Sequence, residues 1–229
     1  MATPNLRISP KTVQQQIVEK LRGAISEGVF KPGDRLVEAD LCEMLGVSRP
    51  SIREALRSLE AERLVEIIPN RGPQIPVLTW EHASEIYQMR ALLEGEASYI
   101  AAKKATPDDL KLMRASLAAF GKAVRARDMK AEVAFTTEFY GHLLRICGNR
   151  IIEETLAGLL ARINFLRGRS MSQPGRAKFS LQEMKAIFEA VEAGNGNAAR
   201  SAAIRHVENA HRSANAAYEE LSSKEDSAA

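Results

Sequence analysis

The segment from Leu45 to Gly72 constrains the fold more than any other part of this chain. Gly46 interrupts an apolar helical pattern, and Ser48, followed closely by a proline, is placed to begin a new helix. Three arginines then recur at every fourth position, and β-branched residues flank the tight-turn sequence Pro69–Gly72. Two helices joined by a short turn and followed by a hairpin predict a winged helix-turn-helix.

The spacing of apolar residues predicts the other elements of this first domain. Apolar residues repeat with helical period before the hairpin, which predicts helices over 12–27, over 37–45 and from Ser48 onward. The third helix is expected to bury Ile52, Ala55, Leu56 and Leu59. A first strand is expected at Val65, Ile67 and Ile68, and a returning strand at Ile75 and Val77.

From Thr79 onward the pattern predicts helices alone. Turn residues separate six segments, at 80–104, 107–126, 129–147, 150–169, 177–193 and 197–222. The fold class is therefore mainly α, with an N-terminal winged helix-turn-helix (1–78) and a C-terminal all-α bundle of six or seven helices (79–229). Because no Gly/Ser-rich linker separates them, the two domains are expected to be coupled.

Composition restricts the function classes. The chain is 45% hydrophobic and 27% charged, as in ordinary globular proteins, and its net charge of +3 does not by itself indicate a nucleic-acid partner. No apolar run approaches the roughly 20 residues that a transmembrane helix needs, and no signal peptide is evident. Cys42 and Cys147 lie in apolar patterns and are expected to be small buried side chains. A cytoplasmic protein without a membrane partner is expected.

Arg49, Arg53 and Arg57 share one face of the third predicted helix. Like charges at this spacing repel one another by a few tenths of a kcal/mol per pair, about 0.2–0.5. Duplex DNA would supply the missing opposite charge, since arginine binds guanine edges and helix N-termini bind phosphates. The alternative is a solvated face on which Glu54 and Glu60 pair with the arginines.

The stretch LVEADLCEMLGVSRPSIREALRSLEAERLVEIIPNRG resembles the GntR family of bacterial transcriptional regulators. The resemblance implies that Arg49 and Arg53 contact the operator and that the wing tip enters the minor groove. Where some members carry an arginine in the second helix, this chain has Ala39, so one base contact is expected to be missing. The candidate DNA-binding residues are Ser48, Arg49, Ser51, Arg53, Arg57, Arg71 and Gly72.

The rest of the chain resembles the effector domain of the FadR subfamily, in its smaller, VanR-type branch. The matching stretches are MRALLEGEASYIAAKKATPDDL, FYGHLLRICGN and AIFEAVEAGNGNAARSAAIRHV. The resemblance implies a ligand-responsive transcription factor, a repressor by family tendency. It also implies a homodimer that binds a palindromic operator, because a two-fold protein reads two half-sites.

Many relatives hold a divalent metal in this domain through one Asp and three His. The corresponding positions here are Thr136, Tyr140, Met184 and His206, so one of the four ligands is retained. Thr, Tyr and Met are poor ligands for zinc, nickel or manganese. No metal and no other cofactor is therefore expected. His142 is expected to point away from this site.

The same positions suit a polar organic ligand, and a carboxylate is the expected effector class. The candidate effector-binding residues are Arg90, Thr136, Tyr140, Met184 and His206. Arg90 corresponds to an arginine that often faces the ligand in relatives, but an intrahelical pair with Glu94 is an equal alternative. Packing in the core is the alternative for Met184 and His206.

Two other function classes remain to be weighed. An enzyme on the helical bundle is not expected, because a ferritin-like di-metal site needs two Glu-x-x-His pairs and the sequence has one, Glu208–His211. A nucleophile elbow and a phosphate-binding loop are also missing from the sequence. An architectural DNA-binding protein that senses no ligand is the third possibility. Small carboxylic acids and sugar acids would leave the melting temperature of such a protein unchanged.

Overall fold

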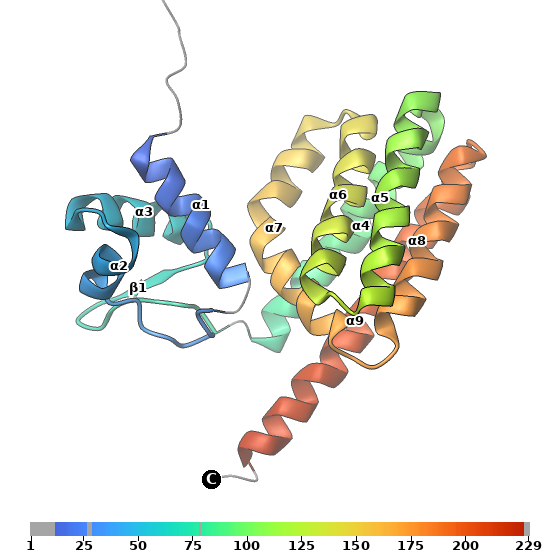
Figure 1. The fold of residues 1–229 in the computed structure, drawn as a ribbon. Helices are drawn as coiled ribbons and strands as arrows, with labels where there is room; N and C mark the ends of the chain where they lie inside the picture. Colours follow the sequence, from blue (N-terminus) through green and yellow to red (C-terminus); the bar gives the residue numbers. More distant parts are fainter. Residues whose placement is uncertain (1–11, 27–28, 78, 227–229) are drawn as a thin grey trace, which may run out of the picture. The chain divides into compact units, whose positions relative to one another are not determined.

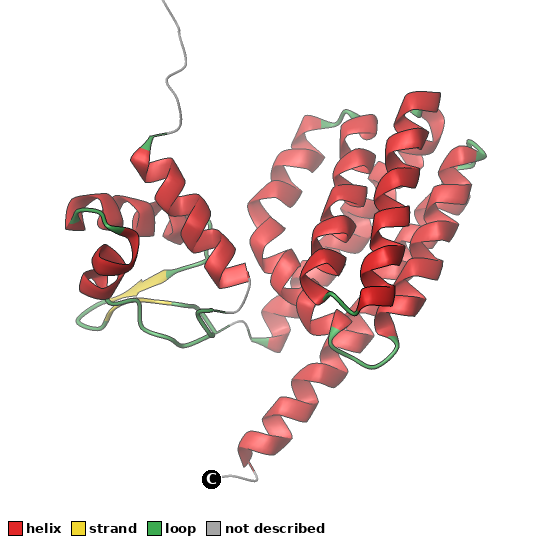
Figure 2. Ribbon diagram, in the orientation of Figure 1, coloured by secondary structure: helices red, strands yellow, loops and turns green. Residues whose placement is uncertain are grey.

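The computed structural model describes residues 12–26, 29–77 and 79–226. By its internal contacts the chain divides into two compact units, Met1–Val77 and Leu78–Ala229. Within the described residues, both strands belong to the first unit and the second is built from helices (Figure 2). None of the described helices is long and apolar enough to span a bilayer.

The first unit has the element order of a winged helix-turn-helix (Figure 1). Its elements are α1 (Val13–Ser26), α2 (Glu38–Leu45), α3 (Arg49–Ala61), β1 (Glu66–Ile68) and β2 (Gly72–Gln74). The predicted helices are confirmed, although Glu27 lies outside the described residues and Val13 is exposed. The predicted core residues of α3 are all buried: Ile52, Ala55, Leu56 and Leu59.

The turn between α2 and α3 follows from three residue types. Gly46 adopts the left-handed conformation with φ of 64°, and its N–H donates to the Cys42 carbonyl over 2.9 Å, which ends α2. Ser48 then caps α3, where its hydroxyl accepts a hydrogen bond from the Ser51 N–H, and Pro50 occupies the first turn. Both capping predictions for this turn are confirmed.

The returning strand of the wing is shorter and earlier than predicted. β1 pairs with β2 in antiparallel register, with Ile68 opposite Gly72, whereas Ile75 and Val77 lie beyond the strand. Ile75 instead pairs with a distant loop: its N–H donates to the Asp34 carbonyl over 2.9 Å. This long-range pairing, which the sequence pattern does not reveal, takes the place of a longer hairpin.

The second unit is a bundle of six helices across residues 79–226 (Figure 1). They are α4 (Trp80–Lys104), α5 (Pro107–Ala126), α6 (Met129–Cys147), α7 (Arg150–Met171), α8 (Arg176–Glu192) and α9 (Gly196–Asp226). The predicted segments are confirmed, and α7 and α9 run a few residues further than expected. Thr106 forms a capping box with Asp109 at the start of α5, as a Thr-Pro break suggests.

An aromatic stack joins the first turns of α4 to α9. The rings of Trp80 and His211 are stacked, with their centroids 5.0 Å apart. The ring of Tyr87 also contacts His211, at 4.8 Å between centroids. The Ser84 hydroxyl lies 3.1 Å from His211 Nε2. This stack fixes the beginning of α4 against the middle of α9.

Gly95 allows the close approach of α4 to α9. A Cβ atom at this position would lie 2.9 Å from Cγ1 of Ile204 on α9. Gly95→Ala is expected to lower the free energy of unfolding by about 1–2 kcal/mol, because overpacking outweighs the gain in helix propensity. Chemical denaturation of the full chain measures this change.

Gly141 on α6 is the matched control for Gly95. It is exposed, and nothing lies within 4 Å of the position that its Cβ would take. Gly141→Ala should therefore stabilise the protein by up to about 1 kcal/mol. Equal effects of the two substitutions would contradict the close packing of α4 on α9.

Candidate DNA-binding and effector sites

The arginines of α3 lie on its exposed face, opposite the buried stripe. Arg49, Arg53 and Arg57 are all exposed, whereas Ile52 and Leu56 are buried in the first unit. Ser48 and Ser51 stand at the N-terminus of the same helix, with their hydroxyl oxygens 2.9 Å apart. The helix therefore presents guanidinium groups and, at its N-terminus, two hydroxyls on its exposed side.

Arg53 has a carboxylate partner that the sequence reading did not identify. Its Nε donates to both carboxylate oxygens of Glu38 on α2, at 2.9 Å each. The alternative of pairing with the intrahelical Glu54 is therefore wrong for Arg53. Because the side chain of Arg53 is 60% exposed, this ion pair orients it without removing it from solvent.

The other cations of this surface have no carboxylate partner within the described part of the chain. Arg49, Arg57 and Arg71 make no ion pair there, so their charges are available to an external anion. Arg71 stands at the wing tip, where its N–H closes the turn onto the Ile68 carbonyl over 3.0 Å. Arg35, which the sequence analysis missed, places its guanidinium about 3.9 Å from the position that a Cβ on Gly72 would take.

The predicted effector residues gather in the interior of the second unit. Arg90, Thr136, Tyr140, Met184 and His206 are each at most 3% exposed. The rings of Tyr140 and His206 are stacked at 5.9 Å between centroids. Residues from α4, α6, α8 and α9 thus share one buried region, as expected for the four helices that carry them.

Arg90 forms the intrahelical pair that the sequence allowed. Its Nε lies 2.8 Å from Glu94 Oε1, and both side chains are almost completely buried. Burial works against charge on both, but each holds the other ionised: the pKa of Glu94 is lowered and the pKa of Arg90 is raised. The pair nevertheless leaves Nη1 and Nη2 of Arg90 and Oε2 of Glu94 without a hydrogen-bond partner among the described residues.

A second buried arginine, Arg167 on α7, faces the same region. Its Nη1 donates to Thr137 Oγ1 over 2.8 Å and to Asn164 Oδ1 over 3.1 Å, and its guanidinium lies 5.4 Å from the centre of the Tyr140 ring. Burial, with repulsion from Arg90, lowers the pKa of Arg167 to about 10, so it remains charged at neutral pH. No carboxylate within the described part pairs directly with it.

Glu183 on α8 joins three partners. It accepts hydrogen bonds from His206 Nδ1 and Arg176 Nη2, each at 2.7 Å, and from Asn209 Nδ2 at 2.6 Å. Although burial alone would raise it, the hydrogen bonds from His206 and Arg176 lower the pKa of Glu183 to about 2. Burial lowers the pKa of His206, so its imidazole is neutral at pH 7 and donates from Nδ1.

We call the buried ionisable residues of this region the arginine cluster. The cluster comprises Arg90, Arg167, Arg176, Glu94, Glu183, Tyr140 and His206. With His206 neutral, it carries one positive charge in excess. Among the described residues, Tyr140 Oη, Arg167 Nε and Arg176 Nε also lack a hydrogen-bond partner. Buried, positively charged hydrogen-bond donors without an acceptor destabilise the ligand-free protein. They are typical of a site that binds an anion.

The sequence analysis missed Arg167, Arg176 and Glu183. A signal for Arg167 exists in the helical phase of α7, because Arg167 falls in register with Ile163, Leu166 and Ser170, which are all buried. A charged residue on the apolar face of a predicted helix marks a buried functional group. Arg176 and Glu183 pair with each other along α8, but the other partners of Glu183, His206 and Asn209, come from α9 and carry no such signal.

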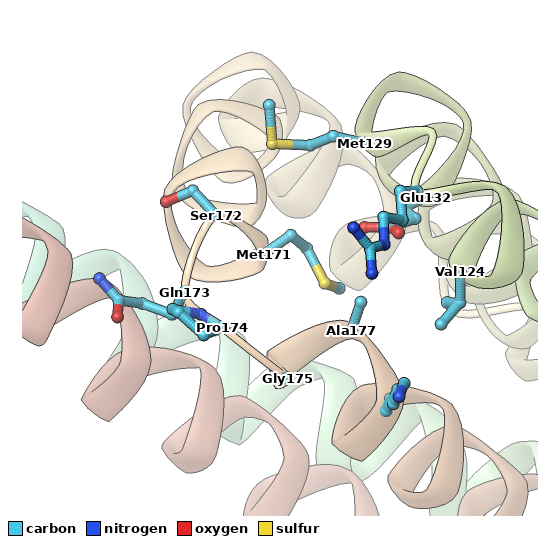
Figure 3. A pocket seen from close by; sticks show the side chains of 11 residues that line it. Val124, Met129, Glu132, Met171, Ser172, Gln173, Pro174, Gly175 and Ala177 are labelled. Carbon is cyan, nitrogen blue, oxygen red and sulfur yellow. The ribbon is translucent and has the colours of Figure 1, made fainter.

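A pocket of about 620 Å³ adjoins the arginine cluster at one end of the bundle (Figure 3). Its walls are the α5–α6 turn, the end of α7 and the start of α8. The lining residues are Val124, Arg127, Met129, Glu132, Met171, Ser172, Gln173, Pro174, Gly175, Ala177 and Lys178. Gly175 and Ala177 flank Arg176 of the cluster, and Glu132 precedes Thr136 by one helical turn. The predicted effector residues are not among those that line this pocket.

The residues at the relatives' metal positions do not fit a divalent metal ion. Burial raises the pKa of Tyr140 well above its usual value, so a neutral phenol stands there. Thr136 Oγ1 donates to the Glu132 carbonyl over 2.8 Å, and Met184 offers a thioether. Hydroxyl, phenol and thioether groups bind zinc, nickel or manganese poorly. No group of three or more His, Cys, Asp or Glu side chains arranged around a metal position occurs within the described ranges.

Comparison with protein-family models decides the family. Residues 13–75 match the model for bacterial regulatory proteins of the gntR family, and residues 85–209 match the model for the FCD domain. The chain belongs to the GntR family. Its combination of domains is that of a FadR-type regulator, a DNA-binding transcriptional regulator and not an enzyme.

Named relatives agree with this assignment. The GntR-family chain is 31% identical over 198 residues to the HTH-type transcriptional regulator YdhC of Bacillus subtilis. The aligned region covers 86% of this chain and 88% of that protein. It is 29% identical over 214 residues to the galactonate operon transcriptional repressor of Escherichia coli, across 84% and 92% of the two chains. The solved structure of Escherichia coli McbR/YncC shares the fold, with a TM-score of 0.79 at 21% identity over 93% and 100% of the chains.

Proposed function

We propose that this GntR-family regulator is a repressor, of the VanR-type branch, that binds a palindromic operator as a homodimer and responds to a small organic acid. The observation that carries the effector class is the arginine cluster, with its excess positive charge and its unpaired guanidinium N–H groups. Carboxylates are the usual small-molecule partners of such groups. The relative named as a galactonate operon repressor supports a sugar acid or a similar anion.

The DNA-binding part of the proposal rests on the exposed edge of α3. Arg49 and Arg53 are assigned to base edges in the major groove, and Arg57 to phosphate. The hydroxyls of Ser48 and Ser51 and the α3 N-terminus are assigned to phosphate as well. The wing tip, Arg71–Gly72, is assigned to the minor groove. Two protomers would then read half-sites about 34–36 Å apart.

The effector is assigned to the interior of the bundle, inward of the pocket in Figure 3. Arg90 supplies two NH2 groups, Nη1 and Nη2, that have no partner among the described residues. Tyr140, Thr136 and His206 supply polar contacts, and Met184 supplies apolar packing. Arg90 lies on α4, the helix that begins at Trp80 directly after the DNA-binding unit. A ligand held between α4, α7 and α8 would favour one arrangement of these helices, and so one spacing of the paired α3 helices.

Fluorescence anisotropy with the DNA upstream of its own coding region tests this function. We expect preferential binding over random duplex, with an affinity that falls as salt rises. At least one acid from a panel of acetate, succinate, citrate and D-galactonate should raise the melting temperature and release the DNA. Binding without preference for the upstream DNA would overturn the operator assignment, and acids without any effect would leave an architectural DNA-binding protein as the better description.

A further inference from the structure

The positions that hold a metal in many relatives are filled here by residues that do not replace its charge. Thr136, Tyr140 and Met184 have uncharged side chains, and His206 is already engaged, because its Nδ1 lies 2.7 Å from Glu183 Oε2. An organic acid buried in this interior without a cation beside it would lose its hydration with no compensation. The proposed effector therefore requires a positive charge from another source within the bundle.

Arg167 is placed to supply that charge. It is 4% exposed, stands over the ring of Tyr140 at 5.4 Å, and reaches the cluster from α7, a helix that carries none of the four metal-equivalent positions. Among the arginines of the cluster, Arg90 pairs with Glu94 and Arg176 pairs with Glu183. Arg167 has neutral partners, Thr137 and Asn164, and its Nε has no partner among the described residues.

We propose that the guanidinium of Arg167, backed by Arg90, takes the place of the relatives' metal ion as the anchor of the effector's anionic group. This inference rests on the proposed function, because it concerns how the organic acid is held. It makes effector binding independent of metal. The class of ligand follows from the same geometry: a group with two acceptor oxygens, such as a carboxylate, fits a guanidinium fork better than a single oxygen does.

The charge balance of the cluster predicts that Arg167 lowers the stability of the ligand-free protein while it favours binding of an anion. Without ligand, Arg167 is the uncompensated charge, and it lies close enough to Arg90 for mutual repulsion. Arg167→Met keeps similar length and leaves two arginines opposite two carboxylates. Thr137 and Asn164 remain bonded to each other at 2.8 Å, so no new unpaired group results. Replacing an uncompensated buried charge by an apolar side chain is expected to be stabilising, because the unpaired charge has lost its hydration without compensation.

The test measures melting temperatures of the full-length protein after treatment with EDTA. The probes are inorganic phosphate, acetate, succinate, citrate and D-galactonate, each against sodium chloride at equal ionic strength. The wild type should show a saturable rise with at least one probe. Arg167→Met should melt about 2–4 °C higher than the wild type without probe and should not respond to that probe. Arg167→Lys keeps the positive charge but not the planar, two-pronged guanidinium, so its melting temperature should rise only weakly with that probe.

Arg169→Met is the matched control, since Arg169 lies on the same helix and contacts the ring of Phe165. It should respond to the probe as the wild type does. A lower melting temperature of probe-free Arg167→Met would overturn the inference, because the guanidinium would then be a structural element. A full response of Arg167→Met would overturn it as well.

The outcomes also separate this inference from the proposed function. If the acids act only when Zn²⁺, Ni²⁺ or Mn²⁺ is added, the organic-acid effector stands and the role of Arg167 falls. If no acid acts with or without these ions, both fall. A response in EDTA that Arg167→Met abolishes and Arg169→Met retains supports both.

Discussion

Arg49→Ala is expected to weaken operator binding by about 1–3 kcal/mol, a loss of roughly 5- to 150-fold in affinity. Arg49 begins α3 next to the Ser48 cap, is exposed, and has no carboxylate partner in the described part of the chain. Its guanidinium can therefore contact a guanine edge with two hydrogen bonds, and alanine loses both. Fluorescence anisotropy at one fixed salt concentration measures the change.

The salt dependence of the variants separates base contacts from phosphate contacts. A base contact by Arg49 or Arg53 predicts that the alanine variant loses discrimination between operator and random duplex. A phosphate contact by Arg57 predicts a uniform loss across sequences and a salt slope smaller by about 1. Lys20→Ala, on an exposed part of α1, is the control for a general loss of positive charge. Wild-type affinity in both Arg49→Ala and Arg53→Ala would contradict the assignment of α3.

Glu94→Gln is expected to destabilise the second unit by about 3–5 kcal/mol, because it leaves a buried charge without its partner. The carboxylate of Glu94 balances Arg90 at 2.8 Å and also interacts with the charge of Arg167. After the substitution, Glu183 alone opposes three guanidinium groups. Denaturant unfolding of the full chain, analysed for separate transitions of the two units, gives the loss.

Two further variants show whether the loss comes from the unpaired charge. Arg90→Met combined with Glu94→Leu removes both members of the pair and should cost less than Glu94→Gln alone. Glu96→Gln on the same helix breaks an ion pair with Arg200 that is partly exposed, so it should cost at most about 1 kcal/mol. A change below about 1 kcal/mol in Glu94→Gln would show that the pair is not effectively buried.

The sequence predicts those features that depend on neighbouring residues. The helix end at Gly46, the Ser48 cap and the helix break at Thr106-Pro107 are local, and all three are present in the structure. The Arg90–Glu94 pair is also local, at a spacing of four residues. Local patterns thus account for the element order of both units and for the Arg90–Glu94 pair of the arginine cluster.

The features that the sequence did not predict are contacts between distant segments. Arg53 pairs with Glu38 on another helix, and β2 stops early because Ile75 pairs with Asp34. Two of the three partners of Glu183, His206 and Asn209, lie on α9, 23 and 26 positions away. No spacing rule links such residues, so the arginine cluster emerges only once the helices are packed together.

The aromatic stack at the start of α4 gives the protein a built-in optical probe. Trp80 is the single tryptophan of the chain, every tyrosine also follows residue 78, and Trp80 lies against His211. Tryptophan and tyrosine emission, and the tryptophan and tyrosine bands of near-ultraviolet circular dichroism, therefore arise from the second unit alone. Far-ultraviolet circular dichroism, which reports helices in both units, follows the winged helix as well. The two signals recorded in one melt distinguish the unfolding of the helical bundle from the unfolding of the winged helix-turn-helix without any attached dye.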